Sequence, residues 1–206
     1  NLQEVGKALG TNAKLNDKDL TTMTKLTHQA GFTADELMNI QKLSLVNGKT
    51  LEDNTKEILG GASAYAARNG IVVNEKDVLR EVNKSSKALQ LSLGQNTQAI
   101  AESVVKAKQF GLNLEQAGQM AEKLLDFESS IESELSAELL TGKNLNLERA
   151  RQLSLEGDIA GAAAEVARQI GSAAEFGEMN VIQQQAMADA VGLSHEALAA
   201  SLIERE

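Results

Sequence analysis

A short motif that ends one helix and starts the next recurs along this chain. It consists of a glycine, an apolar residue, and then Ser, Thr, Asn or Asp followed by acidic or amide residues. The clearest copy, Gly31-Phe32-Thr33-Ala34-Asp35-Glu36, contains a T-x-x-E capping box. There the Thr33 hydroxyl and the Glu36 carboxylate can each accept a hydrogen bond from a backbone N–H that a helix start leaves unpaired. Because glycine readily takes the left-handed conformation that terminates helices, each motif predicts one stop and one start.

Variants of this motif predict a series of short helices. They occur at Gly48-Lys49-Thr50, Gly111-Leu112-Asn113 (with Gln116), Gly171-Ser172 (with Glu175) and Gly192-Leu193-Ser194-His195-Glu196, and further caps are indicated at Asn74, Asn146 and Asp158. The expected helices cover residues 2–9, 17–30, 34–47, 51–69, 75–92, 96–110, 114–141, 147–156, 159–170, 173–190 and 195–205. Only Ile71-Val72-Val73 has strand composition, and three residues cannot form a sheet alone. The connections are short, so we expect an all-α multi-helix array of short antiparallel helices, with one longer helix near 114–141.

The longest expected helix permits two interpretations of its apolar face. Apolar residues at alternating spacings of three and four indicate a partial coiled-coil seam, which Glu128 interrupts: Leu114, Ala117, Ala121, Leu124, Ile131 and Leu135. An ordinary amphipathic helix explains the same residues with a wider stripe that also includes Leu125, Phe127, Leu139 and Leu140. Both interpretations remain open at this stage.

Composition and charge narrow the classes of function. At 206 residues and 42% hydrophobic the chain can bury a core, but four Phe, one Tyr and no Trp predict thin helix packing and little base stacking. Residues 1–110 carry 14 basic and 12 acidic side chains, and residues 111–206 carry 6 and 17. We therefore expect a near-neutral N-terminal module (1–110) and a strongly acidic C-terminal module (111–206), or one continuous domain, with any division between Gly94 and Gly111. The acidic half would repel duplex DNA, so no direct nucleic-acid binding is expected.

Absent residue types exclude further chemistry. Without cysteine there is no disulfide, no thiolate nucleophile and no cysteine-based metal site. No run of about 18 apolar residues is present, so no membrane span is expected in this segment. The chain starts at Asn1 rather than Met and ends among helix-like residues, which suggests a piece of a longer protein.

Few residues qualify as candidates for catalysis or metal binding. The only histidines, His28 and His195, have no companion at ligand or triad spacing, so a surface or cap-adjacent position is the favoured interpretation. Five acidic residues form a run without a basic residue: Asp126, Glu128, Glu132, Glu134 and Glu138. Carboxylates four residues apart on a helix repel one another and could bind a divalent cation, but a solvated helix face explains the run more simply. Gly157 and Gly161, at G-x-x-x-G spacing, favour tight helix packing over a membrane dimerisation face. Gly60-Gly61 lacks a phosphate-binding pattern. The prediction is therefore no enzyme, with no catalytic, cofactor-binding or metal residues and no cofactor.

One long string resembles a known family. It runs from Leu124-Leu125-Asp126-Phe127-Glu128-Ser129-Ser130-Ile131-Glu132 through Glu134-Leu135-Ser136-Ala137-Glu138-Leu139-Leu140-Thr141-Gly142-Lys143 to Asn144-Leu145-Asn146-Leu147-Glu148-Arg149-Ala150-Arg151. This string resembles a segment of tail length tape-measure proteins of tailed bacteriophages. The similarity extends from about Gly60, through Val78-Leu79-Arg80-Glu81-Val82 and Leu91-Ser92-Leu93-Gly94, to Gly192-Leu193-Ser194, whereas residues 1–59 add little.

The resemblance implies a virion protein in the tail lumen or at the tail tip that acts in tail assembly, length determination and genome ejection. The implied partners are the tail tube protein, the baseplate or tail-tip hub, tail-assembly chaperones and other copies of itself. The repeated helix stops add that this segment folds back on itself, as a compact terminal or tip-proximal module rather than the extended ruler. Two alternatives remain open: a non-viral helical adaptor or assembly domain without catalytic activity, and an enzyme domain such as a peptidoglycan-cleaving module with one catalytic Glu.

Overall fold

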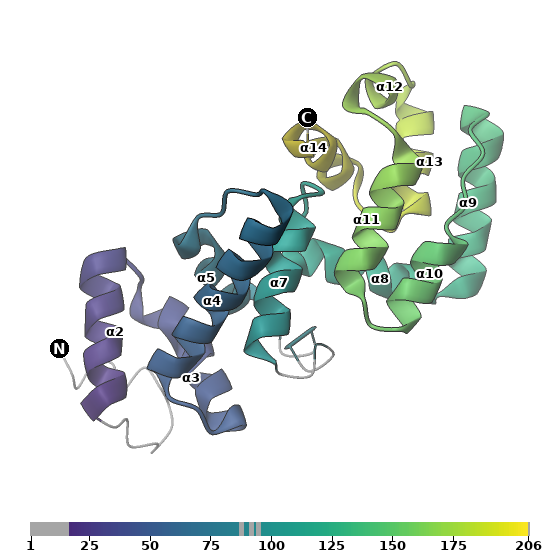
Figure 1. The fold of residues 1–206 in the computed structure, drawn as a ribbon. Coiled ribbons are helices and arrows are strands. Elements are labelled where there is room, and N and C mark those ends of the chain that lie inside the picture. The colour runs from purple at the N-terminus through teal and green to yellow at the C-terminus, as the bar shows by residue number, and fades with distance from the viewer. Residues whose placement is uncertain (1–16, 87–88, 91–92, 94–95, 206) are drawn as a thin grey trace. The chain divides into compact units, whose positions relative to one another are not determined.

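A computed structural model describes residues 17–205, apart from 87–88, 91–92 and 94–95 (Figure 1). Every regular element among the described residues is an α-helix, which confirms the predicted all-α array. The helices are α2 (Asp17–Ala30), α3 (Ala34–Asn47), α4 (Leu51–Asn69), α5 (Glu75–Lys84), α7 (Thr97–Lys108), α8 (Leu114–Leu125), α9 (Phe127–Thr141), α10 (Glu148–Leu155), α11 (Ile159–Ile170), α12 (Ala173–Gly177), α13 (Val181–Ala190) and α14 (His195–Arg205). The expected helix at 2–9 lies outside the described residues.

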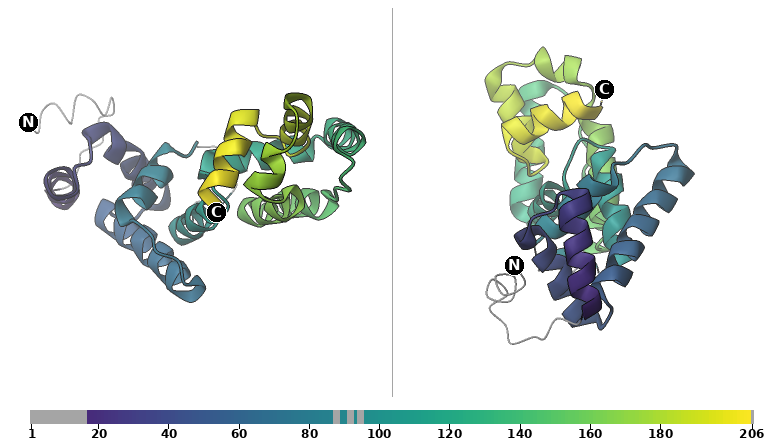
Figure 2. Two further views of the ribbon diagram at one scale, coloured as in Figure 1. Left: turned by 90° about the horizontal axis from the view of Figure 1, so that it is seen from above. Right: turned by 90° about the vertical axis from the view of Figure 1, so that its left-hand side faces the viewer.

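The chain divides into two compact units, Asn1–Glu102 and Ser103–Glu206, with the boundary inside α7. In the N-terminal unit α3, α4 and α5 pack against one another, and α2 contacts α3 and α4 (Figure 2, α2 in purple). Its core includes Phe32, Leu37 and Ile58. The buried Asp19 carboxylate of α2 accepts a hydrogen bond from the Leu51 backbone N–H at 3.0 Å, so a distant side chain helps to cap α4.

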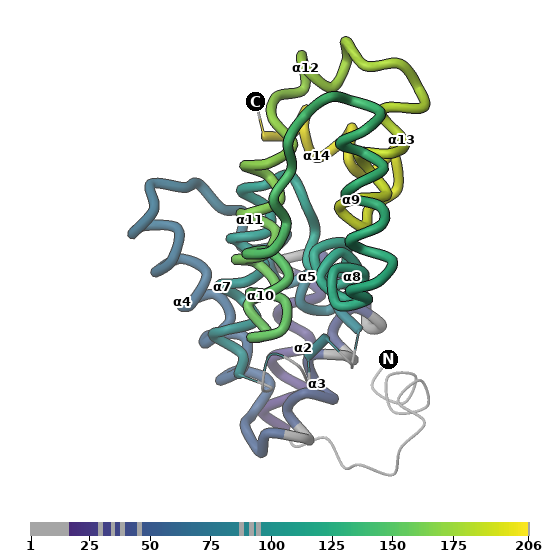
Figure 3. The backbone as a smooth tube through the Cα atoms, turned by 90° about the vertical axis from the view of Figure 1, so that its right-hand side faces the viewer, coloured from purple at the N-terminus to yellow at the C-terminus, as the bar shows by residue number. Residues whose placement is uncertain are grey.

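In the C-terminal unit α8, α10 and α11 form one packed group, and α9 lies along α13 (Figure 3). Further contacts join α8 with α9, α13 with α14 and α12 with α14. Alanine forms much of its core, as in α11, where Ala160, Ala162 and Ala163 are buried. Small side chains let helices approach closely, which agrees with the expected thin packing.

Local capping explains why the predicted helix starts are largely correct. The capping box at Thr33 is formed, with Thr33 N–H 2.8 Å from Glu36 Oε2 and Glu36 N–H 3.2 Å from Thr33 Oγ1. Equivalent boxes form at Asn113 with Gln116 and at Ser172 with Glu175. These are contacts between residues three apart, so the sequence alone contains the information.

Three predicted helices were too long. The helix expected at 75–92 ends at Lys84, because Ser85 is extended (φ −60°, ψ 138°). The single longer helix expected at 114–141 is two helices, broken at Asp126, whose φ of −77° and ψ of 77° are not helical. The helix expected at 173–190 stops after Gly177 and restarts at Val181, where Asn180 and Gln183 form a capping box that the sequence analysis missed.

Neither interpretation of the apolar stripe at 114–141 holds over its full length. Four of its residues in α8 are buried: Leu114, Ala117, Ala121 and Leu124. Beyond the break, α9 buries Ser130 and Ala137 and leaves Ile131 and Leu135 exposed. Because the chain changes direction at Asp126, the residues that α9 buries do not continue the apolar stripe of α8.

The glycine stops differ in how closely they are packed, which gives a matched test. Gly111 and Gly142 both have positive φ, +66° and +71°, but a Cβ on Gly111 would lie 2.7 Å from Ser201 Cα, whereas one on Gly142 would meet nothing. Gly142→Ala should lower the free energy of unfolding by about 1–2 kcal/mol from backbone strain alone. Gly111→Ala should lower it by about 1–3 kcal/mol more, because the helix end must also move away from α14.

Urea unfolding of the whole chain, followed by ellipticity at 222 nm, measures the difference between the two variants. Equal destabilisation by both substitutions would contradict the close approach of Gly111 to α14.

Candidate functional site

The acidic run at 126–138 is divided between the outside and the inside of the fold. Glu128 and Glu132 are exposed on α9, whereas Glu134 and Glu138 are half-buried and face the loop that follows the helix. Asp126 occupies the N-cap position of α9 without a side-chain capping bond. The run is therefore neither one solvated face nor one cluster, and its two inner members bond to the protein itself.

Glu134 and Glu138 supply acceptors for the backbone of the loop at 142–147. The Leu147 N–H donates to Glu134 Oε1 at 2.8 Å, and the Leu145 N–H donates to Glu138 Oε1 at 2.8 Å. Leu147 is the N-cap of α10 and makes no side-chain capping bond of its own. Buried N–H groups need acceptors, and negative charge is favourable at a helix start. The Glu134 carboxylate therefore caps α10, although it lies 13 residues before Leu147 in the sequence.

Arg151 completes this arrangement from α10. Its Nε donates to Ser130 Oγ at 3.0 Å, and its Nη2 forms an ion pair with Glu134 Oε2. The side chains of Arg151 and Glu134 are only 9% and 12% exposed, so each charge depends on the other for its partner. We call Ser130, Glu134, Glu138 and Arg151 the α9–α10 network; through hydrogen bonds and one ion pair it connects α9, the loop and α10, a segment that we call the hairpin.

Lys143 ties the same loop to the end of α11. Its ammonium donates to Glu175 Oε2 at 2.9 Å and to the Ile170 carbonyl at 3.2 Å. The hydrogen bond from Lys143, followed by the backbone N–H of Ser172, holds the pKa of Glu175 below its usual value of 4.5. Because the folded pKa is lowered, this contact stabilises the fold above about pH 4.5 and is lost as the pH falls through the folded pKa.

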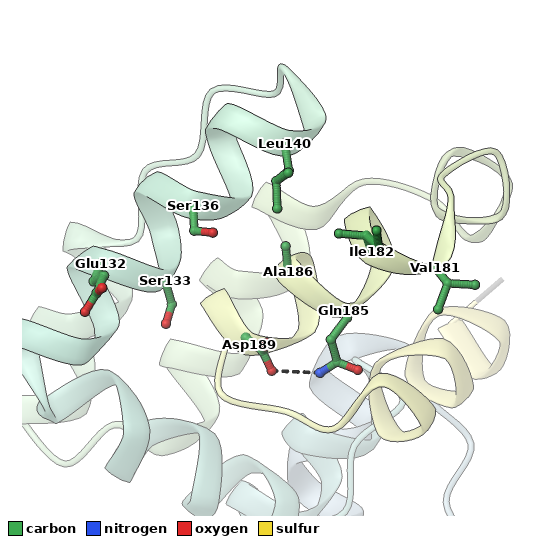
Figure 4. Close-up of a pocket in the computed structure, with 9 residues that line it drawn as sticks. All are labelled: Glu132, Ser133, Ser136, Leu140, Val181, Ile182, Gln185, Ala186 and Asp189. Carbon is green, nitrogen blue, oxygen red and sulfur yellow. Dashed lines mark hydrogen bonds between the residues drawn. The ribbon is translucent and has the colours of Figure 1, made fainter.

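Open grooves lie on two flanks of α9. The first, of about 580 Å³, runs between α9 and α10 and is lined by Phe127, Ile131, Glu134, Leu145, Asn146, Glu148, Arg151, Gln152 and Leu155. The second, of about 570 Å³, runs between α9 and α13 and is lined by Glu132, Ser133, Ser136, Leu140, Val181, Ile182, Gln185, Ala186 and Asp189. Figure 4 shows the second groove, in which Gln185 Nε2 donates to Asp189 Oδ1 at 2.8 Å. Apolar side chains contribute to both walls: Phe127, Ile131 and Leu155 line the first groove, and Leu140, Val181 and Ile182 line the second.

The two histidines have different surroundings. His28 is exposed in the last turn of α2. His195 begins α14, where its Nε2 lies 2.9 Å from Gln184 Oε1 and its ring centroid lies 5.9 Å from that of Phe176. These contacts connect the start of α14 to α12 and α13.

In each glycine pair singled out in the sequence, one member is closely packed: Gly61 in the first and Gly161 in the second. A Cβ on Gly61 would lie 2.8 Å from Gln98 Cγ and 3.2 Å from Gln98 Cα, so this glycine permits close contact between α4 and the first turn of α7. Gly161 makes room for the Asp158 carboxylate, which accepts the Gly161 N–H at 2.8 Å as the cap of α11. The nearest contact at Gly161 is thus between a helix and its own cap.

The described part of the chain contains neither a metal-binding cluster nor a candidate membrane span. No group of three or more His, Asp or Glu side chains there could hold a metal ion. Among the same residues no helix is both long enough and apolar enough to cross a membrane.

We also compared the chain with models of protein families, with curated proteins and with solved structures, and none of them matches it.

The α9–α10 network should contribute strongly to stability. Arg151→Ala leaves the Glu134 carboxylate buried without its cation, so we expect the free energy of unfolding to fall by about 3 kcal/mol. The matched control is Lys56→Ala, which removes the ion pair with Glu52 on α4, where the two side chains are 70% and 50% exposed. An exposed pair of this kind should cost about 0.5 kcal/mol. Similar losses in the two variants, measured by urea unfolding, would show that the network does not hold the hairpin.

Proposed function

We propose that this chain is a non-catalytic, folded helical segment of a bacteriophage tail tape-measure protein, with a role in tail assembly, tail length determination and genome ejection. Its partners would be the tail tube protein, the baseplate or tail-tip hub, tail-assembly chaperones and other copies of the chain. It would reside in the tail lumen or at the tail tip. The proposal rests on the resemblance of residues 124–151 and on what those residues do in the fold.

The observation that carries the proposal is the α9–α10 network. The resembling string contains all four of its residues, and each makes a hydrogen bond or ion pair within the hairpin. The polar pattern of the string is therefore explained by folding: it caps α10, fixes the loop and pairs two buried charges. A structural role accounts for these residues without a reaction, which supports a structural protein.

The helix stops support a compact module over an extended ruler. A continuous helix of 206 residues would span about 300 Å at 1.5 Å per residue. Here the described helices have at most 19 residues, and α8, α10 and α11 pack against one another. A compact unit of about 100 residues has a radius of gyration near 13 Å. Such a segment would add little to a length measurement and would suit a terminal or tip-proximal position.

The acidic surface also suits a passage for DNA. Glu128 and Glu132 are exposed on α9, and residues 111–206 carry 17 acidic against 6 basic side chains. Like charge keeps a polyanion from adhering to the protein during ejection.

Electron microscopy of tailed particles from the bacterial strain that carries this gene tests the proposal. An antiserum raised against the chain should label purified particles on the tail. In-frame deletion of the segment should reduce infectious particles at least about tenfold, yet shorten the remaining tails by far less than about 300 Å, because the segment is folded. The matched control is deletion of an equally long stretch of the parent protein that has an uninterrupted helical pattern, which should shorten the tail by about that length.

Two results would contradict the proposal in different ways. Unlabelled particles with normal tails after the deletion would contradict the tail function and favour a non-viral helical adaptor. Labelled particles whose tails shorten by the full helical length would retain the tail function but contradict the compact module.

A further inference from the structure

The geometry points to the groove between α9 and α10 as a docking site for a short amphipathic helix of a partner protein, with an apolar face and Lys or Arg beside it. This inference goes beyond the proposed function and does not depend on it, because it is carried by the chemistry of one surface of the C-terminal unit. Five features of that surface support it, and each is a property of described residues.

The walls of the groove are apolar and accessible. Phe127 and Ile131 from α9 are 47% and 46% exposed, and Leu155 from α10 is 69% exposed. Leu145 is buried and belongs to the floor. Large side chains facing one open groove from two helices form a contiguous apolar patch, unlike single apolar residues scattered over a surface.

Phe127 is the most informative wall residue. The chain has only four Phe and no Trp, and the Phe32 and Phe176 side chains are buried. Placing one of so few aromatic side chains at the surface gives up burial that the thin core could use. Aromatic residues in apolar depressions commonly supply much of the binding energy of an interface.

The groove is already held in shape. Beneath its walls the α9–α10 network fixes the loop at 142–147, and the Arg151–Glu134 pair is almost fully buried. A partner therefore meets walls that need little ordering, which lowers the entropic cost of binding.

Helical spacing indicates what shape fits. Phe127, Ile131 and Leu135 are each four residues apart on α9, so they form a row that advances about 40° around the helix at each step. Phe127 and Ile131 line the groove, and Leu135 continues the row toward solvent. A second helix with apolar residues at i, i+3, i+4 and i+7 presents the complementary ridge.

The acidic charge around the groove favours a basic partner helix over a second copy of this chain. The exposed Glu148 lines the groove, and three further exposed acidic residues are sequence neighbours of the wall residues Phe127 and Leu155: Asp126, Glu128 and Glu156. Arg151 is already paired with Glu134, and Arg149 is the exposed basic residue on α10. A second copy of the chain would bring the same acidic side chains against these, whereas a partner helix with Lys or Arg beside its apolar face would neutralise them.

A defined peptide tests the proposal with the whole chain. The probe is a fluorescein-labelled helical peptide of about five turns, with leucines at the i, i+3, i+4 and i+7 spacing and lysines beside them. Its partner control has glutamate in place of every lysine. Fluorescence anisotropy should show that the lysine peptide binds, that added salt weakens it, and that the glutamate peptide binds at least about tenfold more weakly.

Substitutions then locate the binding. The double variant Ile131→Ser with Leu155→Ser should weaken binding of the lysine peptide at least about tenfold, because both removed side chains are groove walls. The matched control, Val72→Ser with Ile203→Ser, removes two other exposed aliphatic side chains and should bind as the unsubstituted chain does. Glu128→Gln with Glu148→Gln should weaken binding several-fold and reduce its salt dependence. Circular dichroism of each variant verifies that the helices are retained.

Three results would overturn the proposal. The first is absence of binding by the lysine peptide, or equal binding of both peptides. The second is unchanged affinity of the Ile131→Ser, Leu155→Ser variant. The third is dimerisation of the chain alone in sedimentation equilibrium that this variant abolishes, which would make a second copy the occupant.

Discussion

Every helix start in this protein leaves backbone N–H groups that need an acceptor, and the chain makes many starts. Most are satisfied locally, as at Thr33, Asn113 and Asn180, whose side chains accept from a residue three further on. The loop before α10 is different, because its N–H groups reach back to Glu134 and Glu138 on the preceding helix. That long-range solution requires α9 to lie beside the loop, and it brings Glu134 to Arg151. The hairpin and the groove on its surface follow from this one requirement.

The Glu134 and Glu138 carboxylates take up the side of α9 that faces the loop, so the large apolar residues of this helix lie elsewhere on its surface. The residues that α9 buries are small, Ser130 and Ala137, and the Ser130 hydroxyl accepts a hydrogen bond from Arg151 of α10. The large apolar residues of α9 are consequently left at the surface, where Phe127 and Ile131 line one groove and Leu140 lines the other. A helix that turns its small residues inward and its large ones outward suits contact with another molecule. This arrangement connects the proposed structural function with the proposed docking site.

The sequence predicted most features that depend on neighbouring residues, with the capping box at Asn180 as an exception, and it missed those that depend on tertiary contacts. The starts of α3, α8 and α12 were predictable, because a capping residue and its partner are three positions apart. The break at Asp126 was not, since the apolar spacing of α8 continues past it and only the packing of the two helices shows the change of direction. The acidic run could be recognised from the sequence, but its exposed members could not be told from its half-buried ones. The half-buried Glu134 and Glu138 accept from N–H groups 13 and 7 residues away. Arg151 gave no signal in the sequence, as its partners Ser130 and Glu134 lie on another helix.

Hydrogen exchange of two loop amides measures the central contact most directly. Leu145 and Leu147 precede α10, so their N–H groups have no acceptor within that helix and bond instead to the Glu138 and Glu134 carboxylates. If those bonds persist in solution, both amides should exchange at least about 100-fold more slowly than in an unstructured peptide, by NMR at neutral pH. Exchange of both amides at the unstructured rate would contradict the account, because it would mean that α9 does not hold the loop.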